Sequence, residues 1–322
     1  MEQRISRRSV AGAAIAGVTG FAILRHARGD APIELRCSLD TAPSHPRNVA
    51  FRDFLGKLET ASGGQIRTKL FESGALFPDL QVVKALLQSQ VEMCCPGTWT
   101  ITGFVPDADF SQLPAFYGRD LTLINKTSDG KAGQFVNDRI AGKLQVEVLG
   151  GWFPLGFYNW YSGRKKLTSL ADLRNLKIRS PGGVLISRRI RHFGAIPSVT
   201  AWPSVPLAMT DSEFDALITT NESVNSAKLY ESGLRHSLQD RQGVAFYVPL
   251  VNHDVWTKLG PRLQETMRTL WTDNLPSYRD GAAAAQARAR TDLAAQGVSI
   301  IDVPQPELTR HLTEQITDQF VE

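Results

Sequence analysis

The order of apolar and polar positions alternates between strand-like and helix-like segments along most of the chain. Leu176–Ser180 has the apolar content and length of a buried strand, and residues 184–193 then place apolar side chains at helical spacing. Two similar units follow, with strands at residues 196–201 and 214–218 and helices near residues 205–209 and 226–231. Strands that alternate with helices predict parallel pairing in an α/β layer.

The first hundred residues repeat this pattern. Strands are expected at residues 33–39, 66–71 and 91–96, and helices at residues 44–61 and 79–88. In open α/β sheets ligands bind where the strands end at their carboxyl side. We therefore expect residues 40–45, 71–77 and 97–100 to line one side of a cleft, with His45 and Trp99 among them.

The strand ends of the later units carry Arg179, Trp202, Thr219 and Thr220. An arginine that closes a buried strand is unusual, because an unpaired buried charge is costly. A guanidinium can hold a carboxylate with two parallel hydrogen bonds, and a tryptophan supplies a flat apolar wall beside it. The pattern predicts a site for a small organic anion.

The remaining segments predict connections between two such layers. Helix is expected over residues 121–144 apart from their glycines, and strand over residues 146–150, with glycines at 150, 151 and 156 as candidates for a hinge. A long helix should begin at Pro261 and be kinked or interrupted at Pro276. A short strand at residues 298–303 and a final helix from Pro306 complete the chain.

Charge and composition change this picture at the N-terminus. The 322 residues suit two domains, and 36 Lys and Arg stand against 32 Asp and Glu. Met1–Gly29 holds five of the arginines and one glutamate, so the rest has 31 of each sign, which argues against a nucleic-acid or membrane-surface role. Arg7 and Arg8 before a Gly/Ala-rich apolar run favour a twin-arginine export signal. A general secretory signal and an uncleaved anchor are the alternatives.

Reactive side chains are sparse. Three cysteines, Cys37, Cys94 and Cys95, are too few for a disulfide framework, and we expect three buried apolar side chains. An oxidised pair between Cys37 and the Cys94-Cys95 strand is the alternative. The six histidines show no metal-ligand spacing, and no nucleophile elbow or phosphate loop is present. We expect no metal and no cofactor, although a cation that bridges ligand and protein stays open. An enzyme would need His45 or His253 as a base in the cleft.

The stretch around Arg179 resembles the solute-binding proteins of tripartite ATP-independent periplasmic (TRAP) transporters, the DctP family. The matching segments are Asp172–Arg179, Pro181, Phe193-Gly194-Ala195, Trp202–Val205, Phe214-Asp215-Ala216 and Ala227–Glu231. The resemblance implies a two-lobed α/β periplasmic binding protein fold. Each lobe would be a mixed, mostly parallel sheet flanked by helices, and a long kinked helix would span both lobes. We place the export signal at residues 1–29, lobe I at 30–156 and 245–284, and lobe II at 157–244 and 285–322.

Two positions depart from the family pattern. Many members have an arginine after Gly-Phe, where this chain has Tyr158 followed by Asn159. Many also have an asparagine where this chain has Thr219. The loss of a second cation argues for a monocarboxylate over a dicarboxylate, with hydrogen bonds from phenol, amide and hydroxyl groups.

The resemblance implies a monomeric periplasmic receptor, not an enzyme. It would bind a small organic acid through Arg179, Trp202, Thr219, Thr220, Tyr158, Asn159, Trp99 and His45. Closure of the hinge would then present the ligand to the TRAP membrane permease subunits. A periplasmic enzyme acting on a carboxylate and a ligand-binding subunit of a sensor are the alternative hypotheses.

Overall fold

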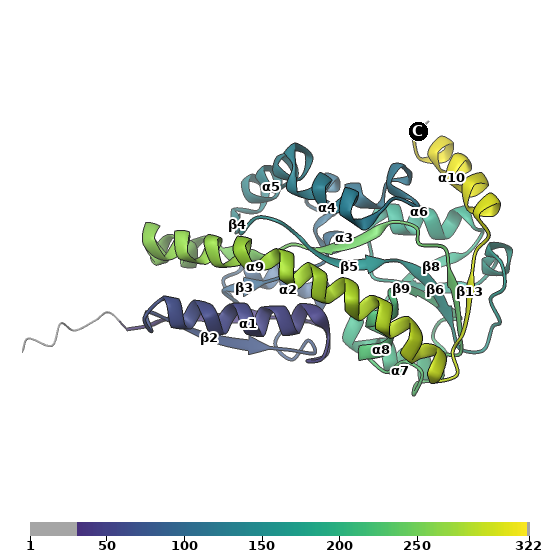
Figure 1. Ribbon diagram of the computed structural model, residues 1–322, viewed down its shortest axis with the longest axis horizontal. Helices are drawn as coiled ribbons and strands as arrows, with labels where there is room; N and C mark the ends of the chain where they lie inside the picture. The colour runs from purple at the N-terminus through teal and green to yellow at the C-terminus, as the bar shows by residue number, and fades with distance from the viewer. Residues whose placement is uncertain (1–30, 321–322) are drawn as a thin grey trace, which may run out of the picture. The chain divides into compact units, whose positions relative to one another are not determined.

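Two β-sheets and a short ribbon between them organise the chain (Figure 1). The computed structural model describes residues 31–320, without the side chains of 312, 313 and 315–320. The first sheet has the strand order β2 (Ile66–Phe71), β1 (Ile33–Ser38), β3 (Met93–Cys94), β12 (Leu250–Asn252) and β4 (Val146–Val148). β1 pairs in parallel with β2 and β3, whereas β12 is antiparallel to β3 and β4.

The second sheet has six strands. Their order is β13 (Ser299–Asp302), β10 (His236–Gln239), β6 (Asn159–Ser162), β9 (Ala216–Thr219), β7 (Lys177–Ser180) and β8 (Ile196–Val199). β7 pairs in parallel with β8 and β9, as the strand–helix alternation predicts. β6 pairs antiparallel with β9 and β10, so the sheet is mixed.

Helices accompany both sheets. Those that follow the strands of the first sheet are α1 (Pro46–Ala61), α2 (Asp79–Leu87), α3 (Thr98–Ile101), η1 (Pro106–Gln112), η2 (Pro114–Phe116), α4 (Leu121–Asp129) and α5 (Lys131–Leu144). Those of the second sheet are η3 (Leu170–Leu173), α6 (Val184–His192), η4 (Trp202–Ser204), α7 (Val205–Thr210), α8 (Asn221–Ser226) and α10 (Gln305–Phe320).

The chain passes between the sheets three times. β5 (Phe153–Phe157) follows β4 and precedes β6, β11 (Val244–Tyr247) runs from β10 toward β12, and the two pair as an antiparallel ribbon. The third crossing is α9 (His253–Ala295), which leads from β12 to β13. Of the described residues, 32–320 form one compact unit, and the lobe boundaries given above stay a prediction.

α1 and α9 lie side by side because each presents an apolar face to the other (Figure 1). Phe51 and Phe54 of α1 have ring centroids 5.3 and 5.4 Å from that of Trp271 in α9. All three side chains are buried. This aromatic contact fixes the long helix against the first sheet, so that its C-terminal half reaches the second.

The course of three helical segments adds detail to the expectations. α9 is continuous through Pro276, and its only non-helical backbone lies at Gly260 (φ 67°), where a left-handed conformation suits glycine. The segment 121–144 is divided at Gly130 into α4 and α5. The helix expected at residues 226–231 instead begins at Asn221, because Thr220 caps it directly after β9.

Two further features concern the cysteines and the membrane. Cys37, Cys94 and Cys95 are buried and unpaired, as expected. Among the described residues, no helix combines the length and apolar character that crossing a bilayer would require. The predicted export signal lies outside the described residues.

Candidate functional site

A small cavity lies where the strand ends of the two sheets approach each other. Its volume is about 20 Å³, which is room for about one water molecule. The residues that line it are Asp40, Asp79, Trp99, Leu155, Tyr158, Arg179, Pro181, Trp202, Ile218, Thr219, Ser223 and Tyr247. Both sheets and the ribbon contribute, so the cavity is shared between the two halves of the fold.

Arg179 is the cation of this cavity. It lies on β7, is 1% exposed, and its Nε and one Nη donate to the carbonyl oxygen of Thr200 at 3.0 and 2.7 Å. Within the described part of the chain, no carboxylate forms an ion pair with it. Burial lowers the pKa of Arg179, and the nearby Asp79 opposes that effect. The guanidinium carbon stands 5.4 Å from the centre of the Trp202 ring, as a cation–π contact requires.

A second buried arginine, Arg47 on α1, is already neutralised. It donates to Asp40 Oδ1 at 2.6 Å, to Thr41 Oγ1 at 2.8 Å and to the carbonyl oxygen of Cys95 at 2.9 Å. Its guanidinium carbon also lies 3.8 Å from the Tyr247 ring centre. Asp40 and Arg47 therefore form a closed pair, which leaves Arg179 as the cation available to an incoming anion.

Asp79 brings a second carboxylate to the cavity. It begins α2 in the first half of the fold, and its Oδ1 accepts a hydrogen bond at 3.0 Å from the backbone N–H of Trp202 in the second half. Its Oδ2 is buried and has no hydrogen-bond partner among the described residues. Burial raises the pKa of Asp79 to about 6. The Asp40 charge also raises this pKa, whereas the Arg179 charge lowers it. At neutral pH it is mostly ionised.

Two hydrogen-bond donors complete the unpaired set. Tyr158 Oη and Trp99 Nε1 are buried and lack partners among the described residues. Burial raises the pKa of Tyr158 well above its usual value, so the phenol keeps its proton. Buried polar groups are nearly always hydrogen-bonded, so two unpaired donors and one unpaired acceptor around one cavity indicate a place for a polar ligand.

Five of the residues expected from the sequence lie together on this cavity: Arg179, Trp202, Thr219, Tyr158 and Trp99. Thr220 does not line it. Its hydroxyl caps α8 and receives a hydrogen bond at 3.0 Å from Gln286 of α9, so it holds the helix that carries Ser223.

Asn159 and His45 also lie elsewhere. Asn159 accepts a hydrogen bond from the Arg241 backbone N–H and lines a separate surface hollow of about 430 Å³. Tyr158, which lies between β5 and β6, lines the cavity, whereas Asn159 begins β6 and does not. His45 is the N-cap of α1, with Nδ1 accepting from the Arg47 N–H at 3.2 Å and Nε2 3.2 Å from Glu222 Oε2. These two residues therefore do not line the cavity, and the ligand contacts expected of them stay a prediction.

Sequence reasoning missed Asp79 and Arg189. Asp79 follows Phe77-Pro78, directly after the segment 71–77 that was expected to line the cleft. An acidic residue at the start of a helix in this position could have been predicted to face the cleft. Arg189 reads as an ordinary helix residue, yet it is fully buried and donates to Tyr117 Oη and the Gln242 carbonyl oxygen at 3.0 and 2.8 Å. It also contacts Gln112 of η1, so it ties α6 to the first half of the fold.

Comparison with known proteins identifies the family. Residues 38–320 match the family model of bacterial extracellular solute-binding proteins, family 7, known as DctP. The chain belongs to this family. The resemblance to TRAP solute-binding proteins stated from the sequence is thereby confirmed.

Individual DctP-family relatives are distant. The 2,3-diketo-L-gulonate-binding periplasmic protein of Escherichia coli is 25% identical over 291 residues, which cover 89% of this chain and 87% of the relative. The C4-dicarboxylate-binding periplasmic protein of Rhodobacter capsulatus is 23% identical, with 71% and 67% covered. The sugar acid binding protein of Advenella mimigardefordensis, solved with galactonate, superposes with a TM-score of 0.84 at 18% identity, over 89% of this chain and 91% of that one. The two-lobed fold is the same.

Proposed function

We propose that this DctP-family protein is the periplasmic receptor of a TRAP transporter, exported by the twin-arginine route. It binds a small monocarboxylate in the cavity and delivers it to a membrane permease when the lobes close. The observation that carries the proposal is a set of groups around one cavity: the Arg179 guanidinium, which forms no ion pair with a described carboxylate, and two buried donors and one buried acceptor that lack hydrogen-bond partners among the described residues. The ligand carboxylate docks on Arg179, with the Trp202 ring beside it.

Charge supports one carboxylate rather than two. Arg179 is the cation left unpaired on the cavity, because Arg47 is neutralised by Asp40 at 2.6 Å. A second ligand carboxylate would face Asp79, which is ionised at neutral pH. A hydroxyl group in the same place would instead donate to the free Oδ2 of Asp79. We therefore favour a hydroxylated monocarboxylate.

Relatives bind acids of both kinds, so the choice has to be made by experiment. Solved structures of similar fold hold D-erythronate in the protein from Polaromonas and succinate in the protein from Sulfurospirillum deleyianum. These two acids have four-carbon chains and differ in whether the chain carries hydroxyls or a second carboxylate. Calorimetric titration of both acids compares the two ligand classes directly.

The enzyme hypothesis loses its candidate bases. His45 is occupied by the α1 cap and by Glu222, and burial holds its pKa well below the usual value. His253 is exposed at the start of α9 and does not line the cavity. A sensor subunit would use the same cavity, and neighbouring genes for the two membrane subunits of a TRAP transporter would favour transport.

Arg179→Ala tests the proposed docking group. Truncation of one partner of a buried charge pair costs about 2–5 kcal/mol, so the ligand Kd should rise about 30-fold to several thousandfold. Arg179→Lys keeps the charge and loses the planar fork, and an intermediate loss is expected. Arg191→Ala, on the exposed face of α6, serves as the matched control with unchanged affinity. Normal binding by a folded Arg179→Ala protein, verified by circular dichroism, would refute this docking site.

A further inference from the structure

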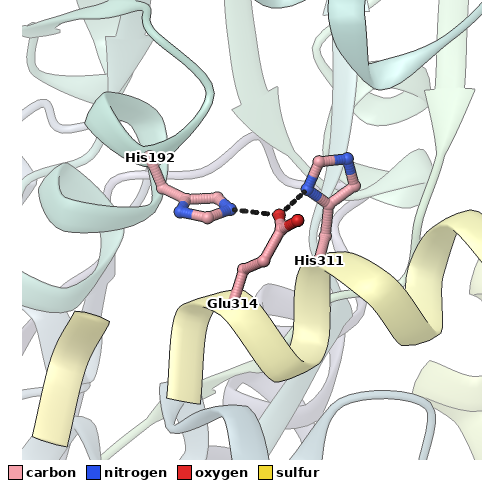
Figure 2. Close-up of side chains that lie close together, drawn as sticks. All are labelled: His192, His311 and Glu314. Atoms are coloured by element: carbon pink, nitrogen blue, oxygen red, sulfur yellow. Dashed lines mark ion pairs between the residues drawn. The ribbon is translucent and has the colours of Figure 1, made fainter. Parts of the chain in front are cut away.

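Two histidines and a glutamate meet away from the ligand cavity, between α6 and α10 (Figure 2). His192 is the last residue of α6, and His311 and Glu314 lie about one turn apart on α10. The side chains of the two histidines are 12% and 16% exposed, and that of Glu314 is 47% exposed. The cluster is therefore partly buried and still open to solvent on the glutamate side.

The three potential ligand atoms have the spacing of a metal site. Glu314 Oε2 is 2.9 Å from His311 Nδ1 and 3.7 Å from His192 Nε2, and all three atoms lie within 4.8 Å of one another. In a tetrahedral zinc site with bonds of about 2.0–2.1 Å, ligand atoms stand about 3.4 Å apart. The two observed distances lie on either side of that value, so small side-chain rotations would bring both contacts to it.

These contacts are not ordinary hydrogen bonds. The 3.7 Å separation is too long for one. The buried Nδ1 of His311 has no hydrogen-bond partner among the described residues, although Glu314 Oε2 is only 2.9 Å away. Glu314 pairs with both nitrogens when the imidazoles are protonated, whereas neutral imidazoles leave two nitrogens and an oxygen arranged as ligands of a common cation.

Neighbouring side chains hold the two imidazoles in place. The Phe193 ring centre is 5.0 Å from each histidine ring, and the histidine rings are 5.7 Å apart in an edge-on arrangement. The Arg310 guanidinium lies 3.3 Å from His311 Nε2. When Nδ1 binds a cation, Nε2 carries the ring proton, and Arg310, which is exposed, turns toward solvent.

We propose that His192, His311 and Glu314 bind a Zn²⁺-like divalent cation that fastens the C-terminal helix α10 to α6. Imidazole nitrogen and carboxylate oxygen are the donors that Zn²⁺ accepts, and three protein ligands leave its fourth position to water. No spacing motif marks the site, because the ligands come from helices far apart in the chain. The site is separate from the cavity and does not depend on the proposed receptor function.

Calorimetric titration of the untagged, chelator-treated protein with ZnCl₂ tests the proposal. We expect one equivalent to bind. His192→Ala and His311→Ala should each weaken Zn²⁺ binding by at least about tenfold, since loss of an outer-shell partner alone has an effect of about 10–100-fold. His253→Ala, which removes an exposed histidine at the start of α9, is the matched control and should bind as the wild type does.

A second readout keeps the test decisive if a histidine variant folds poorly. Glu314→Gln changes a half-exposed side chain and should also weaken Zn²⁺ binding by at least about tenfold. Zn²⁺ should slow amide hydrogen exchange in α10 in the wild type and not in this variant. Absence of saturable binding, or equal Zn²⁺ affinity in the wild type and the three ligand variants, would overturn the proposal.

Discussion

At the scale of single residues, the cavity combines one arginine with one aspartate whose charges partly cancel. Asp79 is 2% exposed and keeps one oxygen unpaired, although its burial is unfavourable for a charge. An acid in a site for anions weakens the attraction of any carboxylate. The acid weakens the attraction of a dicarboxylate more than that of a monocarboxylate. It therefore contributes to specificity, which is the difference between the two affinities. We therefore interpret Asp79 as a residue that selects against a second negative charge.

Asp79→Asn should reduce this selection. The amide oxygen can still accept from the Trp202 N–H, while the charge is lost. We expect the ratio of the succinate Kd to the D-erythronate Kd at pH 7.5 to fall by about fivefold or more, because unit charges about 4 Å apart interact by roughly 1 kcal/mol in water and 4 kcal/mol near a protein surface. Isothermal titration calorimetry measures both constants.

The same ratio should fall in the wild type as the pH is lowered. Because burial raises the pKa of Asp79 to about 6, it is largely protonated at pH 5 and then resembles the asparagine variant. Asp211→Asn, which changes an exposed carboxylate, is the control and should leave the ratio unaltered. If Asp79→Asn left it unaltered as well, Asp79 would have no part in selecting the ligand.

The residues of the cavity differ in how far the sequence could predict them. Arg179 and Trp202 were predictable because the ends of parallel strands converge on one edge. Tyr158 and Asn159 were expected together, but only Tyr158 lines the cavity. The sequence could not predict that the Tyr158 hydroxyl lacks a hydrogen-bond partner, because this depends on which polar groups of the other sheet lie within hydrogen-bond distance. The sequence does not show which of Arg47 and Arg179 is neutralised. The ion pair between Arg47 and Asp40 answers this, and it is seen only in the structure.

At the scale of secondary-structure elements, the two halves meet through helix ends as well as strands. His45 caps α1 on the first sheet, and its Nε2 lies 3.2 Å from Glu222 of α8 on the second. Burial lowers the pKa of His45 well below its usual value and raises that of Glu222 to about 8. Near neutral pH both side chains are therefore uncharged. Because Nδ1 of His45 accepts from the Arg47 N–H, the imidazole proton is on Nε2 and faces Glu222 Oε2.

This pair predicts a loss of stability in mild alkali. A carboxyl whose folded-state pKa is raised stabilises the fold fully below its unfolded value, and that contribution is lost as the pH rises through the folded value. The melting temperature should therefore fall as the pH increases from 7 to 9, and less steeply in Glu222→Gln. Roughly 1 kcal/mol corresponds to about 2–4 °C in large domains. Thermal unfolding followed by circular dichroism gives the two slopes.

Other buried acids make the comparison between variants necessary. Burial raises the pKa of Asp240 to about 7, which contributes in the same direction over part of the range. The α1–α8 contact is therefore measured only by the difference between the wild type and Glu222→Gln in the slope of melting temperature against pH. Glu231→Gln changes a glutamate that is 63% exposed and should keep the wild-type slope. A Glu222→Gln slope equal to that of the wild type would mean that this contact has no proton-linked role.

The elements themselves were predicted best where the chain signals a boundary. β2 and α6 were expected at their observed positions because glycine and proline mark their ends. Pro276 does not interrupt α9. A proline inside a long helix can be accommodated when the residues on both sides are packed, as Trp271 and Ala282 are. The break in the helix lies at Gly260, which has a positive φ. Every glycine can adopt such a φ, so the sequence alone does not show which glycine does.

At the scale of the whole compact unit, the cavity is too small for the ligand it is proposed to bind. About 20 Å³ admits one water molecule, whereas ligand pockets usually measure about 300–1,000 Å³. Direct contacts hold the halves together around it, among them Asp79 with Trp202 and Arg189 with Gln112. An organic acid can therefore enter only if these contacts open, and the three crossings between the sheets are where the backbone has to turn.

Gly156 is the position in these crossings where opening can be tested. It lies in β5 with φ at 117°, and an added Cβ would stand 2.9 Å from the Gln286 carboxamide of α9. Gly156→Ala should therefore strain the closed arrangement by about 1–3 kcal/mol. If opening changes this φ, the ligand-free protein escapes the strain, and its melting temperature should stay near that of the wild type. Only the bound state then carries the penalty, so the ligand Kd should rise about 5- to 150-fold.

Calorimetry and thermal unfolding of the same variant separate a hinge from an ordinary packing site. A Gly156→Ala protein that melts earlier without ligand, yet binds with unchanged Kd, would place the hinge elsewhere, because the strain would then be equal in both states. Gly142→Ala, on α5 with open space around the added methyl, is the matched control: it should leave the Kd unchanged and not lower the melting temperature, because alanine favours a helix over glycine by about 1 kcal/mol. Small-angle scattering should show a smaller radius of gyration on ligand addition in the wild type, since closure draws both sheets toward the cavity.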